Sequence, residues 1–416
     1  MTKPPPFLKY IIVVSILLAG CAQSSAKLTP TDECIGSFER LAYEWPGSGN
    51  ETPGKILPLE PWEVEADLPD LSGVPYPTNR YAVEMIRSLG DHSEVWLSNF
   101  DGRFYDAEKA SYYRLLIYNT GSKEWESVSA ETTYSGVYVG RLFIDQDGII
   151  WGQNFYDGVH RRVEISFLSK FDPVTGRFEI VWEAQRIPAA SHDSTLPTWA
   201  TAYFDDEHLF WVIVSGDGIY SYDTFTQKVE RQVNIPDIEL KATARAEDGS
   251  IFITSYPTVW YENSIQEEGI KLFQFIPGNI QLESVPWPTE RWPSFALMLA
   301  DSSGRLWFDA VGWYDNDGGW HRLYPHPNIY FWKAASRPHS YHSNPSAYVR
   351  MESSDGRIWF DKEARGQGDW QGLAWYNPET ETGCWFTTER GEIKEDAHRN
   401  VWLMVDEKLY RAALDP

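Results

Sequence analysis

Short apolar runs, each preceded by a polar turn, recur along the whole of this 416-residue chain. The clearest pair is Asp301 to Phe308 (Asp-Ser-Ser-Gly-Arg-Leu-Trp-Phe) and Ser353 to Phe360 (Ser-Ser-Asp-Gly-Arg-Ile-Trp-Phe). In both, a glycine stands three residues before a tryptophan, as is typical of a strand that follows a tight turn. Seven such segments are present, and their anchors are Val95-Trp96, Ile150-Trp151, Phe210-Trp211, Ile251-Phe252, Leu306-Trp307, Ile358-Trp359 and Val401-Trp402.

The anchors begin a larger repeat. A second apolar stretch follows most of them and ends on an aromatic residue and an Asp or Asn turn, as in Ile219 to Asp223 and Leu373 to Pro378. A further strand pattern comes next, as in Arg177 to Trp182. No window shows a helical period, whereas short β-rich runs bounded by Gly, Pro, Asn and Asp are frequent. Seven units of four short strands predict an all-β fold, a seven-bladed β-propeller.

The last unit ends at Pro416 before an outer strand can form. The segment Ser37 to Trp45 is similar in pattern to the outer strand Arg177 to Trp182, so we expect an N-terminal strand at residues 34–45 to close the ring. Residues 46–80 are rich in proline and predict an extended connector. The propeller itself is then expected to span residues 81–416.

Composition supports a folded, acidic protein. Aromatic residues make up 15% of the chain and charged residues 23%, which favours a large core over disorder. The net charge of -24 would repel phosphate backbones and anionic lipid, so no nucleic-acid partner is expected.

The N-terminus has the pattern of an export signal. Lys3 and Lys9 precede a short apolar run, Tyr10 to Leu18, which is too short to span a membrane comfortably. The following Leu18-Ala19-Gly20-Cys21 resembles the lipobox of bacterial lipoproteins. The resemblance implies a signal peptide at 1–20, lipid attached to Cys21, and a tether at 21–33 that holds the chain on the extracytoplasmic side of a membrane of the bacterial cell envelope. The alternative is an uncleaved anchor, which also places the rest of the chain outside the cytoplasm.

Two further cysteines, Cys34 and Cys384, lie near opposite ends of the chain. A disulfide between them is expected if the N-terminal strand closes the ring beside the last blades, because the compartment permits disulfides. Two free buried thiols are the alternative.

The segment from Ser353 to Pro378, with its Asp-Gly-Arg-Ile-Trp turn and Gly-Leu-Ala-Trp-Tyr-Asn-Pro continuation, resembles the two-component-regulator propeller repeats of bacterial extracytoplasmic sensor proteins. It is also similar to the propeller of streptogramin lyase. Both resemblances imply a propeller and neither fixes a function. The chain departs from the regulator repeats at Phe308-Asp309 and Phe360-Asp361, where those repeats have Gly-Thr.

No catalytic residue, metal site or cofactor is predicted. The anchor tryptophans are interpreted as blade core. Asp147, Asp248, Asp301 and Asp355 are interpreted as turn formers rather than metal ligands, because a carboxylate can accept the backbone N–H groups of a turn. Histidines crowd into one Pro- and Ser-rich segment, and a solvated loop is favoured there over a metal site because nothing fixes them on one face: His321, His326, His339 and His342.

Aromatic residues in or beside the long inter-strand segments are the candidate ligand contacts. They are Trp313, Tyr314, Trp320, Trp332, Tyr341 and Trp370. Flat rings interleaved with polar side chains suit sugars or peptides. The alternative is that these rings pack the loops onto the blades.

The sequence therefore predicts a lipid-anchored, extracytoplasmic propeller that acts as a binding or protein-interaction module, with a protein, peptide or glycan ligand that the sequence does not identify. The alternative is a propeller lyase or hydrolase acting on a glycan or cyclic peptide at the ring centre. That alternative requires at least two histidines and a carboxylate that converge on a common point.

Overall fold

The computed structural model describes residues 63–69, 81–98, 114–133, 137–156, 167–183, 200–204, 208–214, 216–235, 239–256, 271–279, 281–286, 298–308, 312–315, 319–322, 348–362, 372–379, 382–387, 393–405 and 408–414. Within these ranges the chain forms 28 β-strands and no helix. Accordingly, no helix of this part of the chain is long and apolar enough to cross a membrane.

The strands form seven antiparallel sheets of four strands each. Blade 1 comprises β2 (Ala82–Leu89), β3 (His92–Ser98), β4 (Arg114–Asn119) and β5 (Glu124–Ser129). Blade 2 comprises β6 (Val137–Ile144), β7 (Ile150–Tyr156), β8 (Phe167–Asp172) and β9 (Arg177–Glu183). Blade 3 comprises β10 (Ala200–Phe204), β11 (Leu209–Val214), β12 (Gly218–Asp223) and β13 (Lys228–Asn234). Blade 4 comprises β14 (Glu239–Arg245), β15 (Ile251–Tyr256), β16 (Lys271–Phe275) and β17 (Glu283–Val285).

Blade 5 comprises β18 (Met298–Ala300), β19 (Leu306–Phe308), β20 (Gly312–Tyr314) and β21 (Trp320–Arg322). Blade 6 comprises β22 (Tyr348–Glu352), β23 (Ile358–Lys362), β24 (Gly372–Asn377) and β25 (Thr382–Thr387). Blade 7 comprises β26 (Ile393–Glu395), β27 (Asn400–Val405), β28 (Lys408–Ala413) and β1 (Glu63–Asp67).

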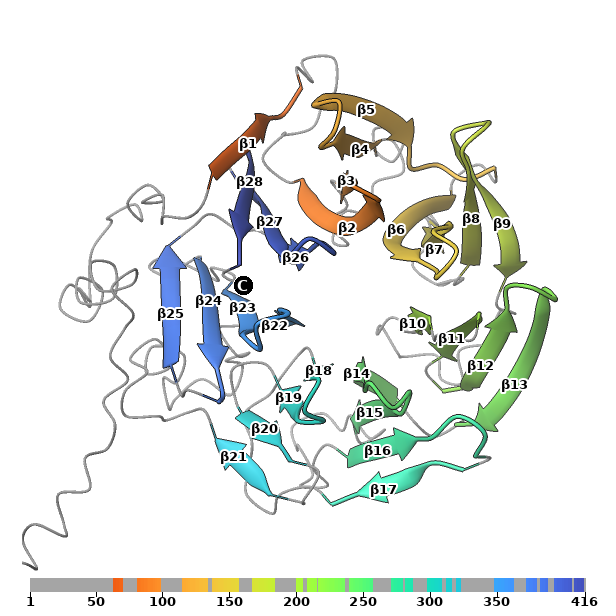
Figure 1. Ribbon diagram of the computed structural model, residues 1–416. Coiled ribbons are helices and arrows are strands. Elements are labelled where there is room, and N and C mark those ends of the chain that lie inside the picture. Colours follow the sequence, from red (N-terminus) through yellow and green to blue (C-terminus); the bar gives the residue numbers. More distant parts are fainter. Residues whose placement is uncertain are drawn as a thin grey trace, which may run out of the picture.

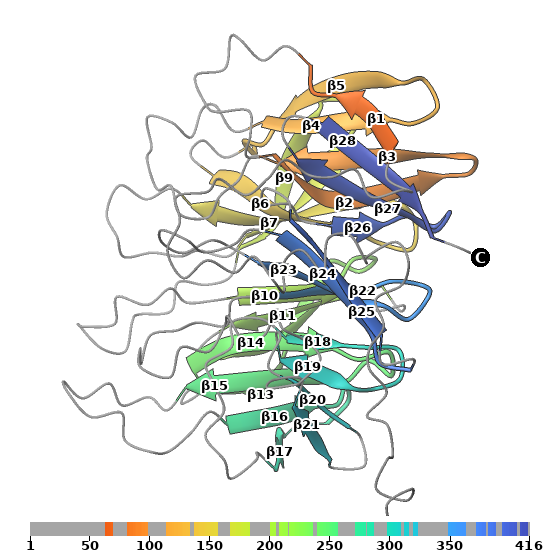
Figure 2. The ribbon, with the colours of Figure 1, turned by 90° about the vertical axis from the view of Figure 1, so that its left-hand side faces the viewer.

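The blades are arranged radially around one axis, with the first strand of each blade innermost (Figure 1). The turns between first and second strands lie at one end of this axis, on the side of the C-terminus (Figure 2). We refer to this end as the turn face. The predicted all-β, seven-bladed propeller is confirmed, and each anchor lies on the second strand of its blade.

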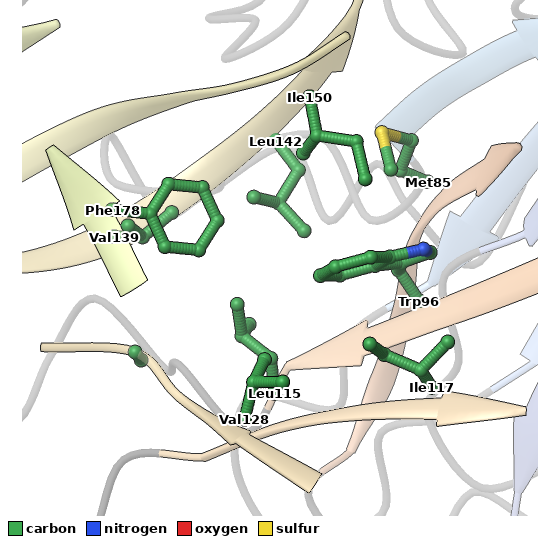
Figure 3. Packing of buried hydrophobic residues seen from close by; sticks show 10 residues of the cluster. Met85, Trp96, Leu115, Ile117, Val128, Val139, Leu142, Ile150 and Phe178 are labelled. Atoms are coloured by element: carbon green, nitrogen blue, oxygen red, sulfur yellow. The ribbon is translucent and has the colours of Figure 1, made fainter. Parts of the chain in front are cut away.

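The core lies between neighbouring blades. Trp96 on β3 is 1% exposed and belongs to a cluster that joins Met85 and Ile117 of blade 1 to Val139 and Ile150 of blade 2 (Figure 3). Because successive strand side chains point to opposite faces of a sheet, each blade contributes apolar residues to both neighbours. The anchor tryptophans are thus blade core.

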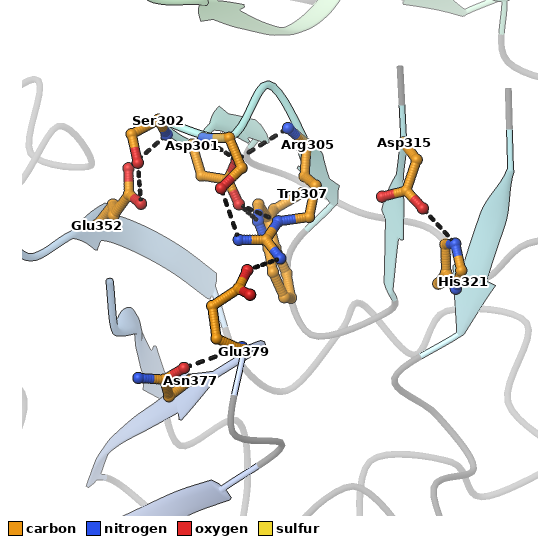
Figure 4. Close-up of polar contacts among 10 residues, drawn as sticks. Asp301, Ser302, Arg305, Trp307, Asp315, His321, Glu352, Asn377 and Glu379 are labelled. Atoms are coloured by element: carbon orange, nitrogen blue, oxygen red, sulfur yellow. Dashed lines mark hydrogen bonds and ion pairs between the residues drawn. The ribbon is translucent and has the colours of Figure 1, made fainter. Parts of the chain in front are cut away.

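A side-chain acceptor in the turn fixes most anchor tryptophans. Asp301 Oδ2 accepts the indole N–H of Trp307 at 2.8 Å, and Asp301 Oδ1 accepts the backbone N–H groups of Ser303 at 3.0 Å and Arg305 at 2.8 Å (Figure 4). The carboxylate therefore shapes the turn and orients the strand that follows it. Asp145 with Trp151 and Asp396 with Trp402 repeat this arrangement, six residues apart.

Blades 6 and 4 have other residues at these two positions, but the donor and the acceptor still match. In blade 6, Ser353 Oγ accepts the Trp359 indole N–H at 3.0 Å, so a hydroxyl replaces the carboxylate. In blade 4 the anchor is Phe252, which has no N–H, and the equivalent turn residue is Ala246. Acceptor and donor are thus lost together, as expected because a buried N–H without a partner is destabilising.

The ring is closed by an N-terminal strand, but at a different place from the one predicted. β1, within the expected connector 46–80, is the outermost strand of blade 7 and pairs with β28. The segment 34–45 lies outside the described residues. The prolines of residues 46–80 led to the prediction of a connector without strands. The five residues of β1, Glu63–Asp67, contain no proline, and they alternate charged with apolar side chains, which suits an exposed outer strand.

Glu65 of β1 links the last blade to the first. Its side chain is 7% exposed, lies 3.5 Å from Arg411 of blade 7, and forms an ion pair with Lys123 of blade 1. Glu65 Oε1 also accepts the hydroxyl of Tyr118 at 3.3 Å. Burial raises the pKa of Tyr118 to about 12, and the Glu65 charge adds to this effect. The closing strand is therefore held by side chains as well as by its ladder with β28.

Candidate functional site

The turn face of blades 5, 6 and 7 carries a repeated contact between blades. Ser302, in the blade 5 turn, donates to Glu352 of β22 through its backbone N–H at 2.6 Å and its hydroxyl at 2.7 Å (Figure 4). Ser354, in the blade 6 turn, donates in the same way to Glu395 of β26, with a backbone N–H distance of 2.7 Å. Each glutamate is thereby fixed by the preceding blade.

Arginines reinforce these contacts. Arg305 joins Asp301 at 2.6 Å within blade 5 and Glu379 at 2.9 Å in blade 6. Arg399, in the blade 7 turn, donates from Nε to Ser354 Oγ at 3.0 Å. These polar contacts connect three consecutive blades and hold their turns in fixed relative positions.

A depression of about 550 Å³ lies at the turn ends of blades 6 and 7. We call it the blade 6–7 depression, and its lining residues are Met351, Glu352, Ser354, Lys394, Glu395, Asp396, Ala397 and Arg399. It presents both signs of charge together with hydrogen-bonding groups, which can pair with the donors and acceptors of a polar ligand.

Burial affects the pKa of one acid in the lining of the depression. The half-buried position of Glu352 raises the pKa of its carboxyl, because desolvation disfavours the charged form, although the Ser302 donors oppose this shift. The Asp301 charge raises it further. Asp396, the third acid of the lining, is 7% exposed and accepts the backbone N–H groups of His398 and Asn400. Its carboxylate shapes the turn.

Two predicted ligand contacts, Trp313 and Tyr314, lie within β20. The Trp313 ring packs on Trp307, with 4.8 Å between centroids, and stacks on His321 at 5.0 Å and an interplanar angle of 6°. His321 Nε2 lies 2.5 Å from Asp315 Oδ2 (Figure 4). Trp313 therefore makes packing contacts within blade 5, in line with the alternative considered for these aromatics.

The other predicted site residues are only partly within the described structure. Trp320 lies on β21 and Cys384 lies on β25, and the structure describes only the backbone of these two residues. Five lie outside the described residues: Cys21, Cys34, Trp332, Tyr341 and Trp370. The pairing of Cys34 with Cys384 remains a prediction.

The described histidines are distributed over four blades. His208 and His398 lie in the turns of blades 3 and 7, His92 is the first residue of β3 in blade 1, and His321 lies on β21 of blade 5. Among the residues that the structure describes, no three His, Cys, Asp or Glu side chains are grouped as metal ligands.

The residues that line the blade 6–7 depression were not singled out from the sequence. A signal for them exists: Ser occupies the second turn position of blades 5 and 6, and Glu immediately precedes the turn of the next blade in both cases. Only knowledge of how neighbouring blades pack makes this pairing visible, because Ser302 and Glu352 are far apart in sequence.

Comparison with known proteins identifies the fold. No protein-family model and no curated protein matches the sequence. YCF48 bound to a D1 peptide is 14% identical with a TM-score of 0.50, over 88% of this chain and 100% of that chain. YCF48 from Cyanidioschyzon merolae is 11% identical with a TM-score of 0.48, over 85% and 98%. The extracellular domain assigned to a hybrid two component system of B. thetaiotaomicron is 11% identical with a TM-score of 0.45, over 81% and 39%.

At these identities the likeness shows the fold alone, and a shared propeller does not carry a function with it. This chain is similar to these proteins in being a β-propeller.

Proposed function

We propose that this protein is a lipid-anchored, extracytoplasmic binding module that holds a peptide ligand in the blade 6–7 depression. The observation that carries the proposal is the depression itself. Its polar walls are fixed in advance by the contacts of Ser302 with Glu352 and of Ser354 with Glu395. Walls that are ordered before binding lose little conformational entropy when a ligand arrives, which favours affinity.

Two further points support the proposal. The depression contains fixed carboxylate acceptors, Glu352 and Glu395, together with the cationic groups of Lys394 and Arg399. A peptide offers both N–H donors and carbonyl or carboxylate acceptors, and so matches both kinds of group. The solved complex of YCF48 with a D1 peptide is an example of a propeller that holds a peptide.

The binding site can be tested by filling it. A random peptide library displayed on phage would be selected against the full-length chain purified in detergent. Selected peptides would then be tested on Ala397→Trp, which places an indole at the mouth of the depression. Gln146→Trp is the matched control, because Gln146 is also exposed and occupies the same turn position in blade 2. We expect Ala397→Trp, and not Gln146→Trp, to abolish binding. Peptides that bind both variants equally well would refute this site.

The anchor is tested separately. The resemblance of the segment around Cys21 to a lipobox supports lipidation. Cys21→Ser is expected to move the chain from the membrane fraction to the soluble fraction and to prevent incorporation of radiolabelled palmitate. Retention of the variant in the membrane fraction would favour the uncleaved anchor instead.

A further inference from the structure

Charge is sorted radially in this propeller. The chain has a net charge of -24. The innermost strands nevertheless carry more basic than acidic side chains: Arg87, Arg141, Lys241, Arg245, Arg350 and Lys394, against Glu84, Glu239, Glu352 and Glu395. The outermost strands have the opposite balance: Glu63, Glu65, Asp67, Glu124, Glu126, Glu179, Glu183, Glu230 and Glu283, against Arg177, Lys228, Arg231 and Arg322.

The basic side chains beside the blade 6–7 depression lie near its level along the axis. Arg350 stands three residues before the blade 6 turn, and Lys394 stands two residues before the blade 7 turn. A strand rises about 3.3 Å per residue, so these positions fall within a band of roughly 10 Å along the axis. β22 and β26 are the innermost strands of consecutive blades (Figure 1). The lining of the depression itself combines two bases, Lys394 and Arg399, with the acids Glu352, Glu395 and Asp396.

Lys394 is the cation best placed to meet a ligand. It is half-buried and lines the depression, and within the described part of the chain its ammonium group has no hydrogen bond or ion pair. Arg399, the second cation of the lining, is oriented by the bond from its Nε to Ser354 Oγ. A cation in a partly desolvated site gains from a ligand of opposite charge.

The acids of the lining decide what kind of anion fits. Glu352 and Glu395 each accept two bonds from a serine, and a carboxylate has further lone pairs for additional donors. These fixed carboxylates would repel a ligand that is anionic throughout, such as phosphate or a sulfated glycan. They would accept N–H groups from a peptide backbone while Lys394 and Arg399 bind its acidic side chains.

We propose that the ligand of the blade 6–7 depression is an acidic peptide segment, whose Asp or Glu carboxylates bind Lys394 and Arg399. This inference rests on the proposed function and adds the chemistry of the ligand. The acidic outer strands would disfavour binding of such a peptide elsewhere, so the radial sorting of charge also contributes to specificity.

The test uses the peptides obtained by phage display. Their amino-acid compositions are compared, and their binding is measured by fluorescence anisotropy. We expect the peptides that require an open depression to be enriched in Asp and Glu. Lys394→Ala should weaken binding of the best peptides about tenfold, which corresponds to about 1.4 kcal/mol. Replacement of the acidic residues of a peptide by Asn and Gln should have a similar effect, since either change removes a charge-assisted hydrogen bond. The control Lys228→Ala removes the same charge from β13 and should change affinity less than about twofold.

The outcomes separate the two proposals. Peptides that are lost with Ala397→Trp but show no acidic enrichment and no response to Lys394→Ala would overturn the acidic ligand and leave the binding site intact. Peptides that bind Ala397→Trp as tightly as the natural chain would refute the site itself. Thermal unfolding of each variant, measured in parallel, shows whether weaker binding reflects loss of the fold.

Discussion

Removal of the Asp301 carboxylate should destabilise blade 5 strongly, because one buried side chain satisfies four donors. Its side chain is fully buried, and it accepts bonds from the Trp307 indole, two backbone N–H groups and the Arg305 guanidinium. In Asp301→Ala the buried indole N–H loses its partner, at a cost of about 1–3 kcal/mol. The turn amides can be partly rehydrated, and with the lost arginine pair they add roughly 1–2 kcal/mol. We expect a total near 3 kcal/mol.

The assay is equilibrium urea unfolding followed by tryptophan fluorescence, with amide hydrogen exchange to locate the effect in blade 5. A double-mutant cycle isolates the indole contact. Because blade 4 combines Ala246 with Phe252, the variant Asp301→Ala/Trp307→Phe removes acceptor and donor together. We expect it to be more stable than the sum of the two single changes predicts, with a coupling of about 1–2 kcal/mol.

Blade 6 supplies a second control, because its turn begins Ser-Ser-Asp where blade 5 has Asp-Ser-Ser. Asp301→Ser/Ser303→Asp gives blade 5 the turn residues of blade 6. The free energy of unfolding of this variant should remain within about 1 kcal/mol of that of the natural chain, since Ser353 Oγ accepts the Trp359 indole N–H in blade 6. An unfolding free energy of Asp301→Ala within about 0.5 kcal/mol of the natural chain would refute the structural role assigned to these turns.

Three further predictions concern ring closure and the depression. Glu65→Ala should lower the free energy of unfolding by roughly 2–3 kcal/mol and increase amide exchange in blades 7 and 1. The change removes the acceptor of the buried Tyr118 hydroxyl, the ion pair with Lys123, and one of the two glutamates that lie beside Arg411. Unchanged exchange in these blades would contradict the closure. The folded-state pKa of Glu352 is raised above 4.5. The stability of the natural chain relative to Glu352→Gln, measured by urea unfolding, should therefore be greatest below pH 4.5 and should fall as the pH rises through the folded-state pKa. A stability difference that does not depend on pH would contradict this prediction. If Cys34 and Cys384 form a disulfide, intact mass after alkylation of denatured, non-reduced chain should show neither modified, and two alkylated thiols would exclude the bond.

The fold was predictable because most blades repeat similar local chemistry. In blade 5, the turn glycine Gly304, the anchor Trp307 and the acceptor Asp301 six residues before that anchor are all visible within one short segment. The closing strand was misplaced because β1 takes its structure from pairing with β28 at the other end of the chain, and its five residues carry no repeat of their own. Long-range pairing of this kind leaves little local signal.

The candidate site was less predictable for a related reason. Aromatic residues drew attention to Trp313, which the structure shows to be packed against Trp307 and His321. The depression is instead lined by charged residues, among them Lys394 and Arg399, which in isolation resemble solvated surface positions. Their significance depends on the neighbouring blade, and that neighbour is set by the ring rather than by the local sequence.

Hydrogen–deuterium exchange in the presence of a selected acidic peptide is the most direct test of the binding site. Bound peptide should protect the backbone of residues 348–356 and 393–400, which include the walls of the blade 6–7 depression, and Lys394→Ala should remove this protection. Protection confined to other blades, or unchanged in Lys394→Ala, would contradict the assignment of this depression as the peptide site.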